Sequence, residues 1–175
     1  MNNVELEILR NKIDDIDSKL CQLIKERQAL ATEIMSAKKG NFPFDPGREE
    51  DLIKKLVNSG LDKFLVEKVW RQIISSNLSI QKVLNIGVAG SDDEIKSAYS
   101  AHFGNYFNTT FFLSVVSLLA SLEKKDIELG FIDSESLDKL KEHTDIKANF
   151  EIIANVPLYK TANQKNYNII KLMNN

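Results

Sequence analysis

The chain has 175 residues, of which 43% are hydrophobic, and a formal net charge of -2 at pH 7. This size allows one medium domain or two small ones with an apolar core, and a nearly neutral chain without a long basic run does not fit a nucleic-acid-binding protein. The single cysteine excludes an intrachain disulfide framework. The polar N-terminus argues against a secretory signal, and the lack of a long apolar stretch argues against a membrane span. We therefore expect a cytoplasmic protein.

The first predicted element is a long amphipathic helix over residues 3–39. No proline or glycine interrupts 5–39, and apolar residues recur with the spacing of one helical face. At about 1.5 Å per residue this helix is about 50 Å long, which exceeds the width of a small domain. It must therefore pack against something beyond its own chain, and a second, antiparallel copy would serve, so we expect a homodimer.

Two shorter helices follow. Asp45 and Pro46 are typical of an N-cap and a first helical position, and the helix that they begin should end before Gly60. Asp62 can cap a third helix that runs to Gln81. The first 82 residues are therefore predicted to form an all-α domain of three helices.

From Lys82 onward the pattern changes to short strands that alternate with helices. Strands are predicted at 83–88, 107–112, 127–132, 150–154 and 167–172, and helices at 91–102, 113–124 and 134–143. This alternation predicts a small α/β lobe over residues 83–175. Both histidines, His102 and His143, fall in helical patterns and are expected at the surface or at a boundary.

Two cations interrupt the apolar face of the first helix. Arg27 and Lys38 fall within about 20° of each other around the helix axis and lie about 16 Å apart along it. Buried cations need an anionic partner, either a carboxylate of the protein such as Glu49 or Asp45, or a bound anion. Arg10 lies about 25 Å from Arg27, so it could reach the same small ligand only from a second, antiparallel copy of the helix.

The other two helices add further polar groups. Arg48 and Glu49 follow the Asp45 cap, and the third helix ends with Gln81. Arginine binds carboxylates in bidentate geometry, and a glutamate can accept a hydrogen bond from a hydroxyl. Lysine and glutamine can donate to an oxygen that gains negative charge. The set suits a small dianion with a hydroxyl and an ether oxygen.

In order and spacing, several segments within residues 3–81 resemble the all-helical, type II chorismate mutases. These segments are 9–14, 26–31, 37–38, 48–49, 73–74 and Gln81. The resemblance implies a three-helix protomer in an intertwined homodimer. It also implies the rearrangement of chorismate to prephenate, in the biosynthesis of phenylalanine and tyrosine, with no cofactor and no metal.

The resemblance assigns roles by position. Lys38 and Gln81 would stabilise the breaking ether oxygen, and Glu49 would orient the hydroxyl. The substrate-binding residues would be Arg27, Asp45, Arg48, Asn77 and, across the dimer, Arg10 of the partner subunit. Asn77 stands where some members carry serine, so a polar group is kept there.

The second half resembles the first lobe of prephenate dehydratases at 86–91, 98–99, 129–132 and 155–158. All four arginines of the chain precede residue 82, and the Thr-Arg-Phe motif of the dehydratase's catalytic strand is missing. A dicarboxylate site without a guanidinium would be unusual. We therefore expect a degenerate lobe with a structural, assembly or regulatory role, and we expect mutase turnover to survive its deletion.

Two other functions stay open from the sequence. A sister enzyme on the same fold, an isochorismate-pyruvate lyase, would use nearly the same cations, although a dehydratase-like half favours the mutase because it would receive prephenate. A non-catalytic helical dimer with a regulatory role is the other alternative. In that case Arg10 could simply pair with Asp14 at the surface.

Overall fold

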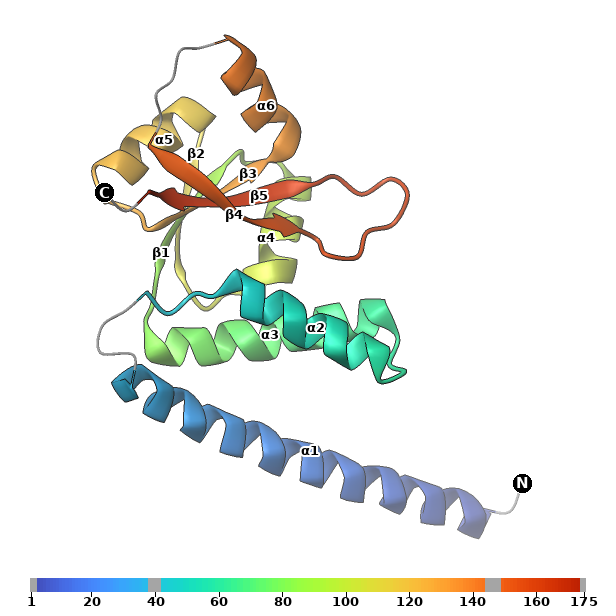
Figure 1. Ribbon diagram of the computed structural model, residues 1–175. Helices are drawn as coiled ribbons and strands as arrows, with labels where there is room; N and C mark the ends of the chain where they lie inside the picture. The colour runs from blue at the N-terminus through green and yellow to red at the C-terminus, as the bar shows by residue number, and fades with distance from the viewer. Residues whose placement is uncertain (1–2, 38–41, 144–148, 174–175) are drawn as a thin grey trace. The chain divides into compact units, whose positions relative to one another are not determined.

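The computed structural model describes residues 3–37, 42–143 and 149–173. The chain divides into two compact units, Met1–Pro43 and Phe44–Asn175. Figure 1 shows the elements of both units along the chain.

The first unit contains the single helix α1, Asn3–Ala37. The predicted long helix is thus confirmed as far as Ala37, whereas Lys38 and Lys39 lie outside the described residues. Large apolar side chains are exposed along its length, namely Val4, Ile8, Leu9, Ile13, Ile16, Leu20, Leu23, Ile24, Leu30 and Met35. Because a single helix cannot bury its own side chains, this apolar face needs a partner surface.

The second unit begins with the helices α2, Pro46–Asn58, and α3, Lys63–Gln81. Each begins as predicted: Asp45 Oδ1 accepts from the backbone N–H of Arg48, and Asp62 Oδ1 accepts from that of Leu65. These caps satisfy backbone donors that have no partner within the helix.

A five-stranded sheet follows, in the order β2-β1-β3-β5-β4. Its strands are β1 Asn85–Ala89, β2 Asn108–Phe112, β3 Leu129–Asp133, β4 Phe150–Val156 and β5 Tyr167–Leu172. β1 pairs in parallel with β2 and β3, while β5 runs antiparallel to both β3 and β4. The connecting helices are α4 Asp93–Phe103, α5 Val115–Glu123 and α6 Ser134–His143. The predicted fold class, a helical region followed by a small α/β lobe, is confirmed.

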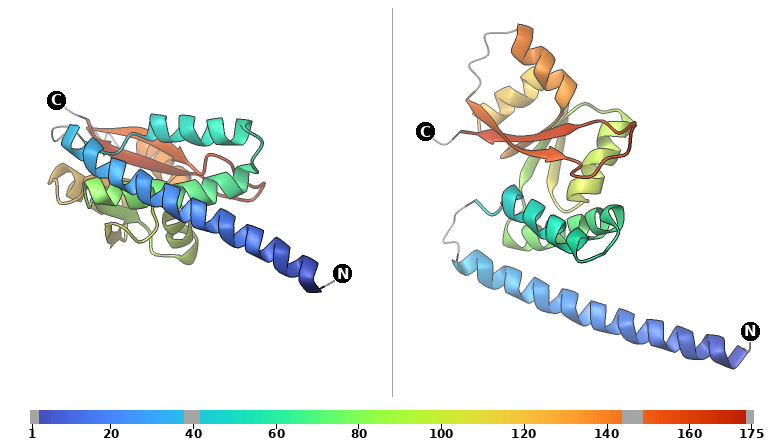
Figure 2. Two further views of the ribbon diagram at one scale, coloured as in Figure 1. Left: turned by 90° about the horizontal axis from the view of Figure 1, so that it is seen from below. Right: turned by 45° about the vertical axis from the view of Figure 1, so that its right-hand side comes forward.

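The two faces of the sheet carry different helices (Figure 2). α5 and α6 cover one face, where Leu118, Leu122 and Leu137 are buried. The other face carries α4, and its core also contains Phe44, before α2, and Leu78 of α3. The helix α3 and the segment before α2 therefore share one hydrophobic core with the sheet.

This shared core changes one expectation from the sequence. Removing residues 83–175 would expose the side of α3 that packs on α4, and burial of apolar side chains is the main stabilising contribution in such a core. The expectation that turnover survives this deletion stays a prediction, and the packing of α3 argues against it. The predicted domain boundary at residue 82 separates the two segments that resemble different families, and it stays a prediction. The two compact units of the structure divide instead between Pro43 and Phe44.

Candidate active site

The first turn of α2 holds three of the predicted site residues. Asp45 Oδ1 lies 3.1 Å from the backbone nitrogen of Arg48, so the carboxylate acts as the helix cap. The Arg48 side chain is exposed at the positive end of the helix dipole. Glu49 follows it, and its backbone N–H donates to the carbonyl of Asp45. A cation and two carboxylates thus project from one capped turn.

The carboxylate of Glu49 is fixed by a buried ion pair with Arg71 of α3. Nη1 of Arg71 lies 2.9 Å from Oε2 of Glu49, and the two side chains are only 6% and 12% exposed. Burial lowers the pKa of Arg71, while Glu49 opposes this shift. Because a buried guanidinium is costly without an anion, the pair holds both groups in one arrangement.

Arg71 was not predicted as a site residue, although the sequence contains a signal for it. It precedes Ile74 by three positions and Leu78 by seven, and both of these side chains are buried on α3. Spacings of three and seven place all three on one helical face. A cation within an apolar face is the same signal that marked Arg27.

The last turns of α3 carry the two predicted amides. Asn77 is buried and Gln81 is half-buried, and their spacing of four places them on one face of the helix. Oε1 of Gln81 is shielded from solvent and has no hydrogen-bond partner within the described ranges. Gln81 can thus present an amide in a partly desolvated position.

The remaining predicted residues belong to the first helix. Arg10 is exposed on α1 and Arg27 is half-buried, while Lys38 lies outside the described residues. The alternative ion pair between Arg10 and Asp14 does not form in the part of the chain that the structure describes. The structure describes α1 separately from α2 and α3, so the meeting of these cations with Arg48 and Glu49 stays a prediction.

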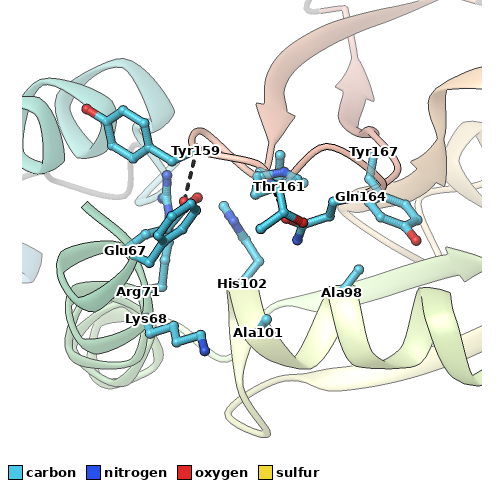
Figure 3. Close-up of a pocket in the computed structure, with 13 residues that line it drawn as sticks. Glu67, Lys68, Arg71, Ala98, Ala101, His102, Tyr159, Thr161, Gln164 and Tyr167 are labelled. Atoms are coloured by element: carbon cyan, nitrogen blue, oxygen red, sulfur yellow. Dashed lines mark hydrogen bonds between the residues drawn. The ribbon is translucent and has the colours of Figure 1, made fainter. Parts of the chain in front are cut away.

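A cavity of about 500 Å³, which Arg71 helps to line, lies among α3, α4 and the connection between β4 and β5 (Figure 3). His102 lines it from the last turn of α4 and is buried, so the prediction that it lies at the surface or at a boundary is wrong. The helical pattern of 93–103 could not reveal that α3 would cover this position. Burial, and next the guanidinium of Arg71, hold the pKa of His102 well below its ordinary value. Glu67 closes one side by accepting hydrogen bonds from the backbone N–H groups of Leu158 and Tyr159.

The described ranges 3–37, 42–143 and 149–173 contain neither a metal-binding cluster nor a membrane-spanning helix. Within them, no three histidine, cysteine, aspartate or glutamate side chains gather as metal ligands would. None of the helices described there combines the length and apolar character needed to cross a bilayer.

Comparison with known proteins places residues 9–82 in the Chorismate mutase type II family. The chorismate mutase of Methanocaldococcus jannaschii is 36% identical over 84 residues, which cover 85% of that protein and 45% of this chain. The chain belongs to the chorismate mutase family. Every predicted site residue, and Arg71 as well, lies within the matched residues.

The chorismate mutase region continues into a second half that also has relatives. The bifunctional chorismate mutase/prephenate dehydratase of Pseudomonas aeruginosa is 28% identical over 79% of this chain, and that of Aquifex aeolicus is 26% identical over 89%. The chain spans 44% and 48% of these two relatives, less than half of their length. No solved structure matches the chain.

Proposed function

We propose that the chain is a chorismate mutase of aromatic amino-acid biosynthesis, which converts chorismate to prephenate. The reaction is an isomerisation within one molecule: a carbon–oxygen ether bond breaks, a carbon–carbon bond forms, and no proton or electron is exchanged with the protein. The observation that carries the proposal is the ordered set of cations, carboxylates and amides within the family-matched residues 9–82.

The two carboxylates of the substrate call for guanidinium groups. Arg48 is exposed at the positive end of α2, where the Asp45 cap fixes its backbone, and its guanidinium can bind one carboxylate in bidentate geometry. Arg27 and Arg10 of the partner subunit would bind the remaining carboxylate oxygens. Asn77 would add a polar contact from α3.

The breaking ether oxygen gains negative charge in the transition state. Lys38 and the amide of Gln81 would donate hydrogen bonds to this oxygen, and preorganised donors of this kind lower the barrier by about 3–4 kcal/mol each. Glu49, together with Asp45, would accept the substrate hydroxyl and hold the ring in the reactive conformation. The protein then acts by positioning and electrostatics alone.

A homodimer is part of the proposal. The apolar side chains exposed along α1 support it, because a helix of 35 residues is about 50 Å long and a second copy offers a surface of equal length. An antiparallel partner would also place its Arg10 near Arg27. We infer a cytoplasmic protein from the single cysteine and from the most apolar stretch of the sequence, 111–122, which is too short and too interrupted by serine to span a bilayer.

The α/β half is proposed to lack dehydratase activity. All four arginines precede it, so none of its own side chains offers a guanidinium to a dicarboxylate. Its packing against α3 supports a structural role instead.

The test is a turnover assay on the purified full chain without added cofactor. Incubation with chorismate should consume it well above the uncatalysed rate and yield prephenate, identified by mass spectrometry. A parallel incubation with isochorismate separates the lyase alternative, which would yield salicylate and pyruvate. A folded dimer that leaves both substrates unchanged would contradict the proposal.

A further inference from the structure

We propose that Arg71 is a positioning residue that holds the Glu49 carboxylate for the substrate hydroxyl, and that α4 of the α/β half keeps Arg71 in place. This inference rests on the proposed mutase function and gives the second half a part in it. Three observations lead to it: the buried ion pair, the hydrogen bonds between α3 and α4, and the covering of Arg71 by His102.

The first step is the restraint on Glu49. A glutamate side chain has several rotatable bonds, and fixing it costs conformational entropy of about 1.5–2 kcal/mol if nothing holds it beforehand. Arg71 Nη1 holds Oε2 at 2.9 Å inside a nearly closed environment, where a charge-assisted hydrogen bond is strong. The carboxylate is therefore oriented before the substrate arrives.

The second step is the attachment of α3 to α4 in the turn that follows Arg71. One residue after it, Gln72 Nε2 donates to the carbonyls of Ser100 and Ala101, each at 3.2 Å. One turn after it, Ser75 Oγ donates to the carbonyl of His102 at 3.0 Å. These three carbonyls belong to the last turn of α4, where helical N–H donors run out: the carbonyl of Ser100 also accepts from the backbone N–H of Gly104, which caps the helix. The side chains of α3 thus hold the end of α4 beside Arg71.

The third step concerns the charge of Arg71. The end of α4 is the negative end of its helix dipole, which favours a nearby cation. His102 is buried in the same turn and lines the same cavity as Arg71 (Figure 3). A neutral imidazole there covers the guanidinium without repelling it. The α/β half therefore supplies both the burial and part of the field that stabilise Arg71.

The exposed ion pair on α2 shows why burial matters. Glu50, which directly follows Glu49, lies 2.5 Å from Lys54 one turn later, but these two side chains are 45% and 52% exposed. Exposed pairs of this kind contribute little and leave both side chains mobile. Lys54→Gln therefore serves as a matched control, because it removes an ion pair from the same helix without touching Glu49.

The experiment is a double-mutant cycle read as steady-state chorismate kinetics on the full chain. Arg71→Gln should lower kcat on the order of tenfold and change KM by less than about threefold, because a misplaced Glu49 binds substrate but orients it poorly. Arg71→Lys, which keeps the charge, should recover part of the loss. On a Glu49→Gln background, both Arg71 substitutions should change kcat by no more than about twofold, because the group that Arg71 positions is already gone.

A second pair of variants tests the support from α4. Gln72→Ala and Ser75→Ala should each lower kcat by about two- to fivefold with Glu49 present and have no further effect with Glu49→Gln. Lys54→Gln should leave kcat unchanged. Circular dichroism and a thermal melt report whether each variant is folded, and if Arg71→Gln is not, the Arg71→Lys cycle decides.

The outcomes separate the two proposals. A wild-type chain without mutase turnover contradicts the proposed function itself. The positioning role is overturned if the wild type is active but the Arg71 substitutions lower kcat equally with Glu49 and with Glu49→Gln. The loss of kcat would then be a general structural effect. Unchanged kcat in folded Arg71→Gln and Arg71→Lys would overturn it as well.

Discussion

His102 in the last turn of α4 lies beside Arg71 of α3, and the two buried side chains line one cavity. Burial and the neighbouring guanidinium hold the pKa of His102 well below its ordinary value, so the imidazole is neutral near pH 7. A charged imidazole would meet a like charge in a desolvated place. The contact between the helical half and the α/β half is therefore expected to depend on pH.

The first prediction concerns this pH dependence. Between its ordinary pKa and its lowered folded-state pKa, His102 binds a proton only in the unfolded chain, so stability is lost as pH falls. In a His143→Gln background, which removes the other histidine, the free energy of unfolding should fall by up to about 1.4 kcal/mol for each pH unit below about 6.5. Urea unfolding at several pH values measures this slope.

Replacement of His102 by asparagine in the same background is the control. Asparagine does not titrate, so the additional slope between about pH 6.5 and pH 5 should disappear even if the variant is less stable overall. Identical slopes with and without His102 would show that its protonation is not linked to folding.

A second prediction concerns Gly104, which ends α4 at a φ of 62° and a ψ of -150°. A Cβ there would lie 2.6 Å from Oε1 of Gln72, the side chain that bonds the end of α4. Gly104→Ala should therefore lower the free energy of unfolding by about 2–3 kcal/mol, since backbone strain and a clash add together. Urea denaturation gives the value.

Gly60→Ala provides the comparison for this glycine. Gly60 also has a positive φ, of 100°, but a Cβ there would meet no atom within 4 Å. That variant should show only the cost of the backbone conformation, about 1 kcal/mol. Equal losses at both glycines would mean that the clash with Gln72 is relieved without cost.

A third prediction concerns Lys38. If its ammonium stabilises the ether oxygen, Lys38→Ala should lower kcat on the order of a hundredfold or more, because a preorganised donor to developing charge is lost. Lys39→Ala, at the next position, should retain turnover. The measurement is the initial rate of chorismate consumption, and a normal rate in Lys38→Ala would remove this residue from the mechanism.

A fourth prediction tests the shared site of the dimer. Arg10→Ala and Lys38→Ala should each be nearly inactive alone, because each removes one contribution to every site. Mixing them through unfolding and refolding forms heterodimers in which one site has both residues intact, so about a quarter of wild-type activity should return at equal mixing. Recovery would require that Arg10 and Lys38 of one site come from different chains, and a mixture as inactive as its parts would exclude this arrangement.

The local sequence pattern was sufficient to predict the position of most helices and strands. The bounds of α2, α6 and β5 are those expected from the sequence, because a capping residue, a proline or a change of hydrophobic period marks each end within a few residues. The order of the strands had no such signal. β5 lies between β3 and β4 and runs antiparallel to both, and pairing over this distance depends on the whole chain.

The polar residues of the candidate site were equally readable, since Arg27, Arg48, Glu49 and Gln81 stand in a recognisable order on helices with clear periodicity. Arg71 carried a local signal, a cation on an apolar helical face, but neither its partner Glu49 nor the burial of His102 could be predicted, because burial depends on both surfaces that enclose a side chain. The covering turn of α4 comes 27 residues after Ser75 in the chain. Side-chain chemistry and helical phase are local properties, whereas the environment that sets a pKa or fixes a carboxylate arises only when distant segments pack together.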